Sequence, residues 1–369
     1  MSLVFKELGE LVDFKGGGTP SRNVEEYWDN SIPWATVKDL NEGITLTQTQ
    51  EFISELGLKN SASNLITKGT IIIPTRMALG KVVISEIDVA INQDLKAVSV
   101  KDKEKLDVKY LLRFLESYKE NIASMGKGAT VKGITLDQLK AIKVPLPPLA
   151  AQRRIASILD QADELRQKRQ QAIEKLDQLL QATFIDMFGD PVSNSKKWTE
   201  KTLGEVVVFN TGKLDSNAAE ENGIYPFFTC SRTPFAINTY AFDIEALLLA
   251  GNNAAGQYWV KHYKGKFNAY QRTYVLTIKD SLCTYGYLRY VLQFLLGFLQ
   301  RMSKGSSTKY LTLSILKPIK IPIPPLDLQR KFIQFYENID SQNQLLMRNE
   351  IEFSKLFFTL QNQAFNGTL

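Results

Sequence analysis

The chain is poor in the residues on which most enzyme sites depend. Its 369 residues include one histidine, His262, and two cysteines, Cys230 and Cys283. A Ser-His-Asp or Cys-His mechanism would need that one histidine, and a metal site built from several histidines is excluded. Two cysteines so far apart in the sequence do not form a disulfide framework, so we expect a protein of the reducing cytoplasm. We predict no catalytic residue and no metal ligand.

Nucleotide-binding loops and membrane-spanning segments are also missing from the sequence. The four Gly-Lys pairs are not followed by the residues of a phosphate-binding loop, and Gly16 to Gly18 lead into Thr19-Pro20, as in a surface turn. The most apolar stretch, Val291 to Leu299, is far shorter than the ~20 residues that a membrane helix needs. We therefore expect no cofactor in this chain and no contact with a membrane.

The charge of the chain is unevenly distributed. Overall composition is that of an ordinary globular protein, with 44% hydrophobic and 23% charged residues and a net charge of +6. Residues 191–326 contain 16 Lys and Arg against 8 Asp and Glu, whereas residues 1–149 contain 19 of each kind. An excess of this size in one segment is typical of a domain that binds a polyanion.

A long internal repeat is the most informative feature of the sequence. The segment Gly128 to Leu136 returns at an offset of 177 as Gly305 to Leu313, and Val144 to Leu149 returns as Ile321 to Leu326 at the same offset. In each copy a Gln-Arg pair follows shortly afterwards. A period of this length indicates a duplicated domain rather than a solenoid unit.

The two copies differ in length near their beginnings. The match of Leu8-Gly9-Glu10 with Leu203-Gly204-Glu205 has an offset of 195 instead of 177, so the first copy is longer than the second by the difference between these offsets. Two related domains with separate specificities would share their motifs and differ in the segments between them, as these two copies do. Because the repeat has two equivalent parts, we expect a target with two parts.

Short β-branched and aromatic runs bounded by turn residues predict strands in both copies. These runs cover residues 69–74, 81–85 and 95–100 in the first copy, and 246–251, 258–261 and 274–278 in the second. Helical periodicity follows at 108–124 and 285–302. We predict an α+β fold with globular domains at 1–149 and 191–326, each followed by a long helix, at 150–190 and 327–369.

The two long helices have apolar residues at alternating steps of three and four. The seam positions are Ile155, Ile158, Ala162, Leu165, Leu176 and Leu179 in the first helix, and Phe332, Phe335, Ile339, Leu346, Phe353 and Leu356 in the second. Polar residues interrupt both seams, at Arg169, Gln342 and Asn349. This pattern predicts an antiparallel coiled-coil pair, in which the polar positions either fix the register or are merely solvated.

In this order of motifs the chain resembles the specificity subunit of Type I restriction-modification enzymes. The resemblance covers essentially the whole chain. It depends on the duplicated Pro-Leu-Pro-Pro-Leu and Pro-Ile-Pro-Pro-Leu motifs, at Pro145 to Leu149 and Pro322 to Leu326, each with its Gln-Arg pair and long helix. The strand-loop patterns Arg76 to Val83 and Lys264 to Tyr274 add to it.

The resemblance implies a non-catalytic subunit that recognises double-stranded DNA. Each globular domain would be a target recognition domain for one half of a bipartite site, and the paired helices would act as a spacer. Two methyltransferase (modification) subunits, with S-adenosylmethionine, and restriction subunits, with ATP, would be its partners. The chain has no Asn/Asp-Pro-Pro-Tyr/Phe methyltransferase motif, so catalysis would belong to those partners.

Basic and amide side chains near the loops are the candidate DNA contacts, because Lys and Arg bind phosphates while Arg, Asn and Gln read base edges. The candidates are Thr19, Ser21, Lys38, Arg76, Lys81, Asn92, Gln93, Lys127, Lys132, Arg232, Asn252, Asn253, Lys261, Lys264, Lys266, Asn268, Gln271, Arg272, Lys304 and Lys309. For Asn92-Gln93 and for Asn268 to Arg272, a role in bracing a strand is an open alternative. The Gly-Lys loops at Lys127 and Lys304 are equally compatible with structural turns.

Two other functions are consistent with the same residues. One is the recognition subunit of a Type IIB-like enzyme, whose partner combines methylation with cleavage. The other is a structural adaptor that recruits proteins through its coiled coil and its globular domains. The basic segment 191–326 argues against the adaptor, and the neutral segment 1–149 argues mildly for it.

Overall fold

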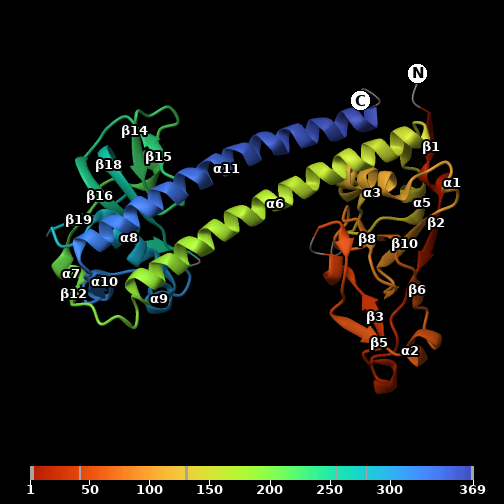
Figure 1. The fold of residues 1–369 in the computed structure, drawn as a ribbon, viewed down its shortest axis with the longest axis horizontal. Coiled ribbons are helices and arrows are strands. Elements are labelled where there is room, and N and C mark those ends of the chain that lie inside the picture. Colours follow the sequence, from red (N-terminus) through yellow and green to blue (C-terminus); the bar gives the residue numbers. More distant parts are fainter. Residues whose placement is uncertain (1–3, 41–42, 129–131, 255, 280, 367–369) are drawn as a thin grey trace. The chain divides into compact units, whose positions relative to one another are not determined.

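The computed structural model describes residues 4–40, 43–128, 132–254, 256–279 and 281–366. The chain forms two compact units: unit 1 contains Met1–Gln170 and Arg348–Leu369, and unit 2 contains Gln171–Met347. Both combine sheets with helices, so the predicted α+β class is confirmed (Figure 1). The two long helices, α6 (Leu149–Phe188) and α11 (Leu326–Asn366), each contribute to both units. Within the described residues no helix is long and apolar enough to cross a membrane.

Unit 1 consists of a globular part that precedes α6, the first part of α6 and the last part of α11. Its elements are β1 (Phe5–Glu7), α1 (Leu8–Leu11), β2 (Val12–Gly16), η1 (Glu25–Tyr27), β3 (Ile32–Ala35), η2 (Val37–Leu40), β4 (Thr45–Leu46), β5 (Glu51–Ile53), α2 (Glu55–Lys59), β6 (Asn64–Ile66), β7 (Ile71–Pro74), β8 (Val83–Ser85), β9 (Val89–Ile91), β10 (Leu95–Val100), α3 (Val108–Ser117), α4 (Lys119–Met125), α5 (Leu136–Lys140) and β11 (Lys143–Pro145).

Unit 2 repeats this order with fewer elements. They are β12 (Glu200–Thr202), α7 (Leu203–Val206), β13 (Val207–Thr211), η3 (Ser216–Ala218), β14 (Tyr225–Phe228), β15 (Phe235–Ile237), β16 (Phe242–Ala250), β17 (Asn252–Asn253), β18 (Val260–Ala269), β19 (Thr273–Ile278), α8 (Tyr285–Phe294), α9 (Leu296–Met302), β20 (Lys309–Tyr310), α10 (Leu313–Leu316) and β21 (Lys320–Pro322).

The predicted single helices over 108–124 and 285–302 are each two helices. Tyr118 separates α3 from α4 with ψ 6°, and Leu295 separates α8 from α9 with ψ −7°. Both values depart from the ψ of about −42° of a continuous α-helix. Tyr118 and Leu295 are related by the same offset of 177, so the repeat includes the two breaks.

The sheets of the two units share a topology. The order β2-β10-β7-β8-β4 in unit 1 corresponds to β13-β19-β16-β18 in unit 2. A parallel pair is also equivalent in the two units, β3 with β9 and β14 with β18. The long strand β18 occupies the positions that β8 and β9 hold separately in unit 1.

Nearly all of the extra length of the first copy lies in one segment of the sheet region. The last residues of β3 and β7 are Ala35 and Pro74, 39 positions apart, whereas the last residues of β14 and β16 are Phe228 and Ala250, 22 positions apart. The longer segment contains η2, β4, β5, α2 and β6. Unit 1 therefore has a β4 edge strand and an α2 turn that the second copy does not share.

In each unit a buried glutamine near the start of the long helix forms hydrogen bonds with the backbone of the globular part. Gln152 donates hydrogen bonds to the carbonyl oxygens of Lys105 and Pro147, both at 2.9 Å, and accepts one from the Asp107 amide at 2.9 Å. Gln329, its counterpart in the repeat, makes the same three bonds with Leu282, Pro324 and Thr284. The Gln of the repeated motif is thus a structural residue, since it satisfies three buried backbone groups.

The helices α6 and α11 run antiparallel within each unit. In unit 1 the Arg166 guanidinium lies 5.9 Å from the Phe357 ring, and that of Arg169 lies 4.8 Å from the Phe353 ring. In unit 2 the Asn343 amide donates to Asp177 Oδ1 at 3.1 Å. In both units residue numbers rise along one helix as they fall along the other.

Several predicted seam positions are wrong. Leu165, Leu179 and Leu356 are 43%, 47% and 62% exposed. The polar positions Gln342 and Asn349 are exposed as well, which agrees with the alternative that they are solvated. The buried residues of the two helices include Leu159, Ile173, Leu180, Asn343 and Phe357, together with the predicted Ile155, Phe332 and Ile339. A strict alternation of three and four has a period of 3.5 residues, and a helix of 3.6 residues per turn drifts from it by about 20° per heptad.

Candidate nucleic-acid interface

In unit 1 three backbone segments meet at one edge of the sheet, where β7 ends and β10 begins. The Thr75 amide donates to the Asp94 carbonyl at 2.7 Å, and the Ile134 amide donates to the Thr75 carbonyl at 3.0 Å. Lys127 and Gly133 exchange two backbone hydrogen bonds at 2.9 Å. We call the described residues 75–77, 92–94, 127–128 and 132–134 corner 1. It brings together the candidates Arg76, Gln93, Lys127 and Lys132.

Unit 2 builds the same corner from equivalent backbone groups. The Gly251 amide donates to the Arg272 carbonyl at 2.9 Å, and the Leu311 amide donates to the Gly251 carbonyl at 2.8 Å. The backbones of Lys304 and Tyr310 are paired as those of Lys127 and Gly133 are. We call residues 251–253, 270–272 and 304–311 corner 2. The candidates that it brings together are Asn252, Asn253, Gln271, Arg272, Lys304 and Lys309.

Glycine is required where the two lysine loops turn. Gly128 has φ 134° and Gly305 has φ 117°, a region that side-chain-bearing residues rarely adopt. A Cβ on Gly305 would lie 2.0 Å from the Thr308 carbonyl oxygen. The repeated glycines therefore have a structural reason, and the turns expose the neighbouring Lys127 and Lys304.

The side chains of corner 1 form a polar group with one carboxylate. Arg76 Nη1 lies 4.0 Å from Asp94 Oδ1, and Thr19 Oγ1 donates to Gln93 Oε1 at 2.6 Å. The Lys96 amine donates to the Gln93 carbonyl at 3.0 Å. Partial burial lowers the pKa of Lys96; Asp94 opposes this shift and Arg76 adds to it. Thr19 thus joins corner 1 through Gln93.

The side chains of corner 2 are organised by an aromatic residue. Arg272 Nη1 donates to Tyr310 Oη at 3.3 Å, and the guanidinium lies 5.4 Å from the Tyr310 ring centre. Gln271 Nε2 donates to Asp215 Oδ2 at 3.3 Å. Asn253 pairs with Lys309 between β17 and β20. The position that holds Asp94 in unit 1 holds Arg272 here.

Two of the candidate DNA contacts, Asn92 and Asn268, have buried side chains that are hydrogen-bonded within the chain. Asn92 is 6% exposed and accepts a hydrogen bond from the Asp94 amide, and Asn268 is 5% exposed and accepts one from the Ala269 amide. The Asn268 amide group also donates to Thr239 Oγ1 at 3.3 Å. Both side chains brace the ends of strands, which is the alternative role considered for them.

The remaining candidates of unit 2 lie along or beside β18. Lys261 donates to the Ser231 carbonyl at 2.6 Å, and burial lowers the pKa of its amine. Lys264 forms an ion pair with Glu245 at 3.3 Å, and Lys266 lies over the Tyr240 ring at 4.7 Å. The Arg232 guanidinium lies 5.3 Å from the Trp259 ring centre. Lys264 and Lys266 share the exposed face of β18, whereas Lys261 lies on the opposite, less exposed face.

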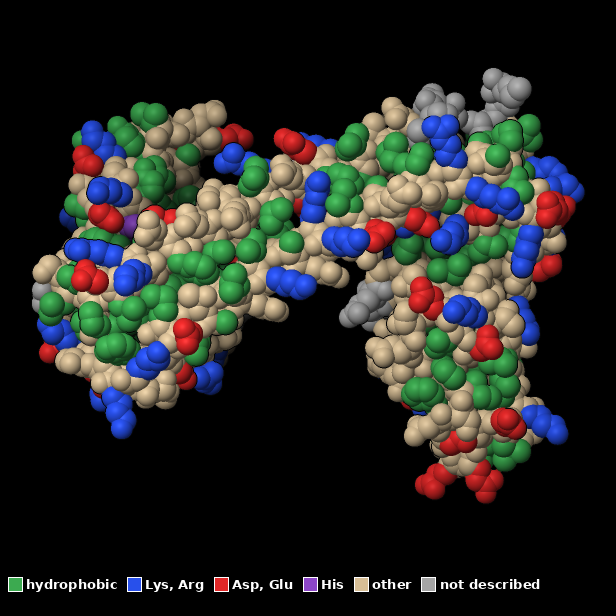
Figure 2. Space-filling model, viewed as in Figure 1, with side chains coloured by type: hydrophobic (Ala, Val, Ile, Leu, Met, Phe, Trp, Pro, Cys, Tyr) green, Lys and Arg blue, Asp and Glu red, His purple; other side chains and the backbone are tan. Residues whose placement is uncertain are grey.

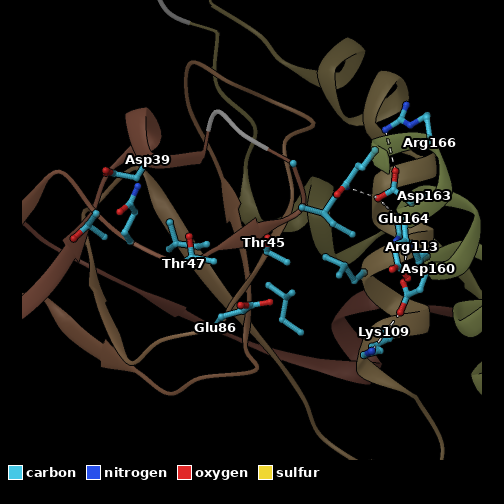
Figure 3. A pocket seen from close by; sticks show the side chains of 18 of the residues that line it. Asp39, Thr45, Thr47, Glu86, Lys109, Arg113, Asp160, Asp163, Glu164 and Arg166 are labelled. Carbon is cyan, nitrogen blue, oxygen red and sulfur yellow. Dashed lines mark hydrogen bonds and ion pairs between the residues drawn. The ribbon is translucent and has the colours of Figure 1, made fainter. Parts of the chain in front are cut away.

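Three candidates of unit 1 lie outside corner 1. Lys81 is exposed at the end of the loop that begins at Arg76, and the Ser21 carbonyl accepts a hydrogen bond from Trp28 Nε1. Lys38 lines a cleft of about 880 Å³ between the β4 segment and the helices α3 and α6 (Figure 3). Asp39, Glu86 and Asp160 line the same cleft.

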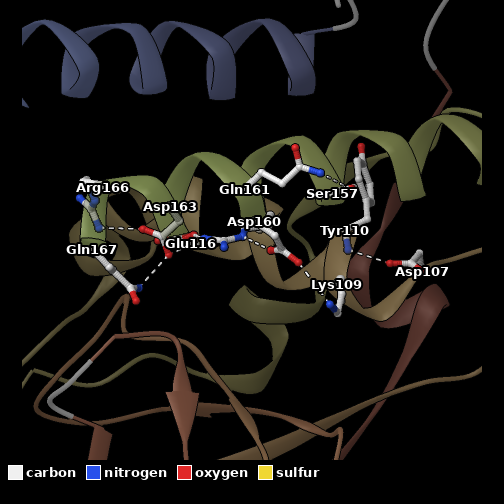
Figure 4. Close-up of polar contacts among 11 residues, drawn as sticks. Asp107, Lys109, Tyr110, Glu116, Ser157, Asp160, Gln161, Asp163, Arg166 and Gln167 are labelled. Atoms are coloured by element: carbon white, nitrogen blue, oxygen red, sulfur yellow. Dashed lines mark hydrogen bonds and ion pairs between the residues drawn. The ribbon is translucent and has the colours of Figure 1, made fainter. Parts of the chain in front are cut away.

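A buried ionic network forms the helical wall of this cleft (Figure 4). Arg113 of α3 is 3% exposed and bonds Asp160 at 2.8 Å, Glu116 at 2.9 Å and Asp163 at 3.3 Å. Burial by itself would lower the pKa of Arg113, but Glu116 and Asp160 outweigh it and raise the pKa, so the guanidinium stays charged. The network joins α3 to α6 inside unit 1.

The end of unit 1 that contains β5 and α2 is acidic. Figure 2 shows carboxylate side chains gathered there, and Glu25, Glu26, Asp29 and Glu55 are exposed. Carboxylates repel phosphates, so this end is a poor DNA surface. The neutral total charge of residues 1–149 therefore conceals a basic corner and an acidic end.

The sequence prediction missed Asp94 and Tyr310. Asp94 directly follows the candidate pair Asn92-Gln93, but a carboxylate is not among the basic and amide groups that bind phosphates or read bases most often. Tyr310 lies in the repeated segment at the position of Gly133, and this exchange within an otherwise regular repeat was the available signal.

Known proteins with similar sequences are specificity subunits. The chain is 26% identical to the Type I restriction enzyme MjaIX specificity subunit of Methanocaldococcus jannaschii, over 94% of this chain and 89% of that protein. It is 38% identical to the EcoR124I/EcoR124II specificity subunit of Escherichia coli, over 44% of this chain and 41% of that protein.

Solved structures share the fold. The S subunit of a Type I restriction-modification system from M. genitalium matches with a TM-score of 0.68 at 18% identity, over 99% of this chain and 96% of that one. A second match comes from a structural study of assembly and conformational transition in the type I restriction-modification system; its TM-score is 0.58 at 17% identity, over 100% and 98% of the two chains. The model of the Type I restriction modification DNA specificity domain matches residues 3–175 and 195–352, so the chain belongs to this family and contains the domain twice.

Proposed function

We propose that this chain is the specificity subunit of a Type I restriction-modification enzyme and that each corner reads one half of a bipartite DNA site. The observation that supports this most is the double occurrence of one backbone frame with different polar side chains. Corner 1 presents Arg76 and Gln93, and corner 2 presents Gln271 and Arg272. Two corners with equivalent backbone and different side chains suit a DNA site whose two halves differ in sequence.

Each corner also has two lysines for the DNA backbone. Lys127 and Lys132 of corner 1 correspond to Lys304 and Lys309 of corner 2 at the constant offset of 177. A lysine amine binds phosphate as a point charge without reading sequence. The lysines would therefore supply affinity, while the arginine and amide side chains supply specificity.

The exposed faces of the long helices suit protein partners. Leu179 of α6 and Leu356 of α11 are equivalent positions of the repeat and both are exposed, so each unit offers an equivalent apolar position. We propose that these faces bind two modification subunits, which supply S-adenosylmethionine and the methylation chemistry in the cytoplasm. Restriction subunits with ATP would join the same complex, and this chain would contribute recognition without catalysis.

Salt-dependent DNA binding tests the proposal. For the chain with its methyltransferase partner on duplex DNA, four lysine-phosphate contacts predict that log K falls by about 0.9 per contact per tenfold rise in salt. Affinity should then fall about a hundredfold between 50 and 200 mM salt. Lys127→Ala or Lys304→Ala should each reduce the slope by about 1. Lys109→Ala, which removes an exposed lysine paired with Asp160, is the matched control and should leave the slope unchanged. Binding that does not respond to salt would favour the protein adaptor.

A further inference from the structure

The two corners place an arginine on opposite strands of the same frame. In unit 1 Arg76 follows β7 and faces Asp94, which precedes β10. The equivalent positions in unit 2 are Asn252, after β16, and Arg272, before β19. The bonds from Thr75 to Asp94 and from Gly251 to Arg272 establish this equivalence. Each corner therefore contains one guanidinium. In unit 1 it follows the strand β7, and in unit 2 it precedes β19, the counterpart of β10.

We propose that Arg76 and Arg272 each read a guanine, one in each half-site, and that Asp94 and Tyr310 are the positioning residues that orient them. The inference rests on the proposed function and adds which residues discriminate and which base they recognise. A guanidinium can donate two parallel hydrogen bonds to O6 and N7 of guanine in the major groove, whereas a lysine amine, which can also bond guanine, lacks this rigid planar geometry.

Arg76 is available for such a contact. Its side chain is 66% exposed, and within the described part of the chain its one polar side-chain contact is the 4.0 Å approach to Asp94. Its backbone is held on both sides, by the Thr75 bond to Asp94 and by pairing with Gly133. The next residue, Met77, has φ 63°, so the chain turns sharply directly after Arg76.

Hydrogen bonds hold the backbones of Asp94 and Tyr310, so that their side chains can orient Arg76 and Arg272. The Asp94 side chain is 11% exposed, its amide donates to Asn92 Oδ1 at 3.1 Å, and its carbonyl accepts from Thr75. Tyr310 exchanges two backbone hydrogen bonds with Lys304, at 2.7 and 3.1 Å. Side chains on anchored backbone reduce the conformational freedom that an arginine must lose on binding.

Arg22 provides the contrast within unit 1. Both of its terminal nitrogens donate to Glu51, at 2.6 and 2.9 Å, and its guanidinium stacks 3.7 Å from the Trp28 ring centre. The fork that would recognise guanine is already occupied by a carboxylate. Arg22 is thus an exposed arginine of the same unit that we do not expect to read a base.

The test uses the full chain with its methyltransferase partner and a library of duplexes randomised in both half-sites. The readout is the sequence of the methylated molecules, with affinity for unrelated DNA measured in parallel. Arg76→Lys should lower the preference for guanine at one base pair of one half-site by roughly 5- to 150-fold, with unrelated DNA bound as before. Arg272→Lys should do the same in the other half-site only. Asp94→Asn should weaken the same preference as Arg76→Lys, by less. Arg22→Lys is the matched control and should change no preference.

Three results would overturn the inference while leaving the proposed function intact. The first is an Arg76→Lys variant that retains every base preference. The second is an Arg76→Ala variant that binds all sequences equally weakly and with a salt slope reduced by about 1, which identifies a phosphate contact. The third is loss of the same preference in Arg22→Lys, which would assign the reading to another residue. A wild-type complex without any sequence preference would instead contradict the proposed function itself. Thermal unfolding of each variant verifies that it is folded.

Discussion

Units 1 and 2 share a set of buried hydrogen bonds and differ in the polar side chains of their corners. Tyr110 donates to the Pro145 carbonyl and Tyr287 to the Pro322 carbonyl, both at 2.9 Å, and the bonds of Gln152 and Gln329 are repeated in the same way. At the exposed corners, Arg76 and Asp94 correspond to Asn252 and Arg272. A buried hydrogen-bond partner cannot be lost without leaving a polar group unsatisfied, whereas an exposed side chain is replaced at little cost to stability.

A second difference lies where each globular part meets the long helices. Unit 1 has Arg113 among carboxylates at the position where unit 2 has Tyr290, which lies 4.8 Å from the Phe184 ring and 5.0 Å from the Phe332 ring. One contact is ionic and the other aromatic, yet the backbone frame is the same. The same backbone arrangement therefore accepts either an ion-paired arginine or a packed tyrosine at this position, provided that the surrounding side chains match it.

Exchange of residues 1–143 for those of a relative should have the largest effect. We expect one half of the recognised sequence to change, with affinity for the original site falling by about a thousandfold or more, toward the level of non-specific binding. The second half should be unchanged, because corner 2 lies wholly outside the exchanged segment. Sequencing of methylated DNA measures both halves at once. Alteration of both halves would show that the units do not read independently.

Arg113→Met should be the next largest effect and should affect unit 1 alone. Removing the buried cation leaves Asp160 with only the exposed Lys109 and Asp163 with only Arg166 as charged partners, so we expect a loss near the lower end of the about 3–5 kcal/mol that breaking a buried ion pair costs. The control is Lys109→Met, since Lys109 pairs with Asp160 at an exposed position, 3.3 Å away, and should cost less than about 1 kcal/mol. Denaturant unfolding combined with hydrogen exchange reports each unit separately. Equal losses in the two variants would contradict a buried ionic network.

The pair Tyr110→Phe and Tyr287→Phe should have the smallest effect and tests the shared frame directly. Each change removes one hydrogen bond to a proline carbonyl, at a cost of about 1 kcal/mol. Because the two bonds have the same length and both tyrosines are fully buried, the losses should agree within about 0.5 kcal/mol. The free energy of unfolding of each unit is the measurement. Clearly unequal losses would mean that the equivalence of the two frames is only geometric.

Much of the fold could be predicted because residues with the same structural role recur at a constant offset in the sequence. The constant offset of 177 covers Gln152 and Gln329 and the lysine pairs of the corners, and the strand runs correspond to β7, β10, β16 and β19. The helical seam was predicted less well, because a few degrees of drift at each turn move Leu179 and Leu356 from the interface to solvent. Burial of Asn92 and Asn268 was also not predictable, since an amide beside a strand can face either way.

The sequence by itself determined that one backbone arrangement occurs twice and that basic and amide residues cluster near the turns. These conclusions follow from composition and periodicity, which local chemistry controls. Only the tertiary structure decided that Arg76 faces Asp94, that Arg272 faces Tyr310, and that Lys38 lies apart in a cleft. Such pairings join residues that are distant in the chain, and strand register and packing determine which of them meet.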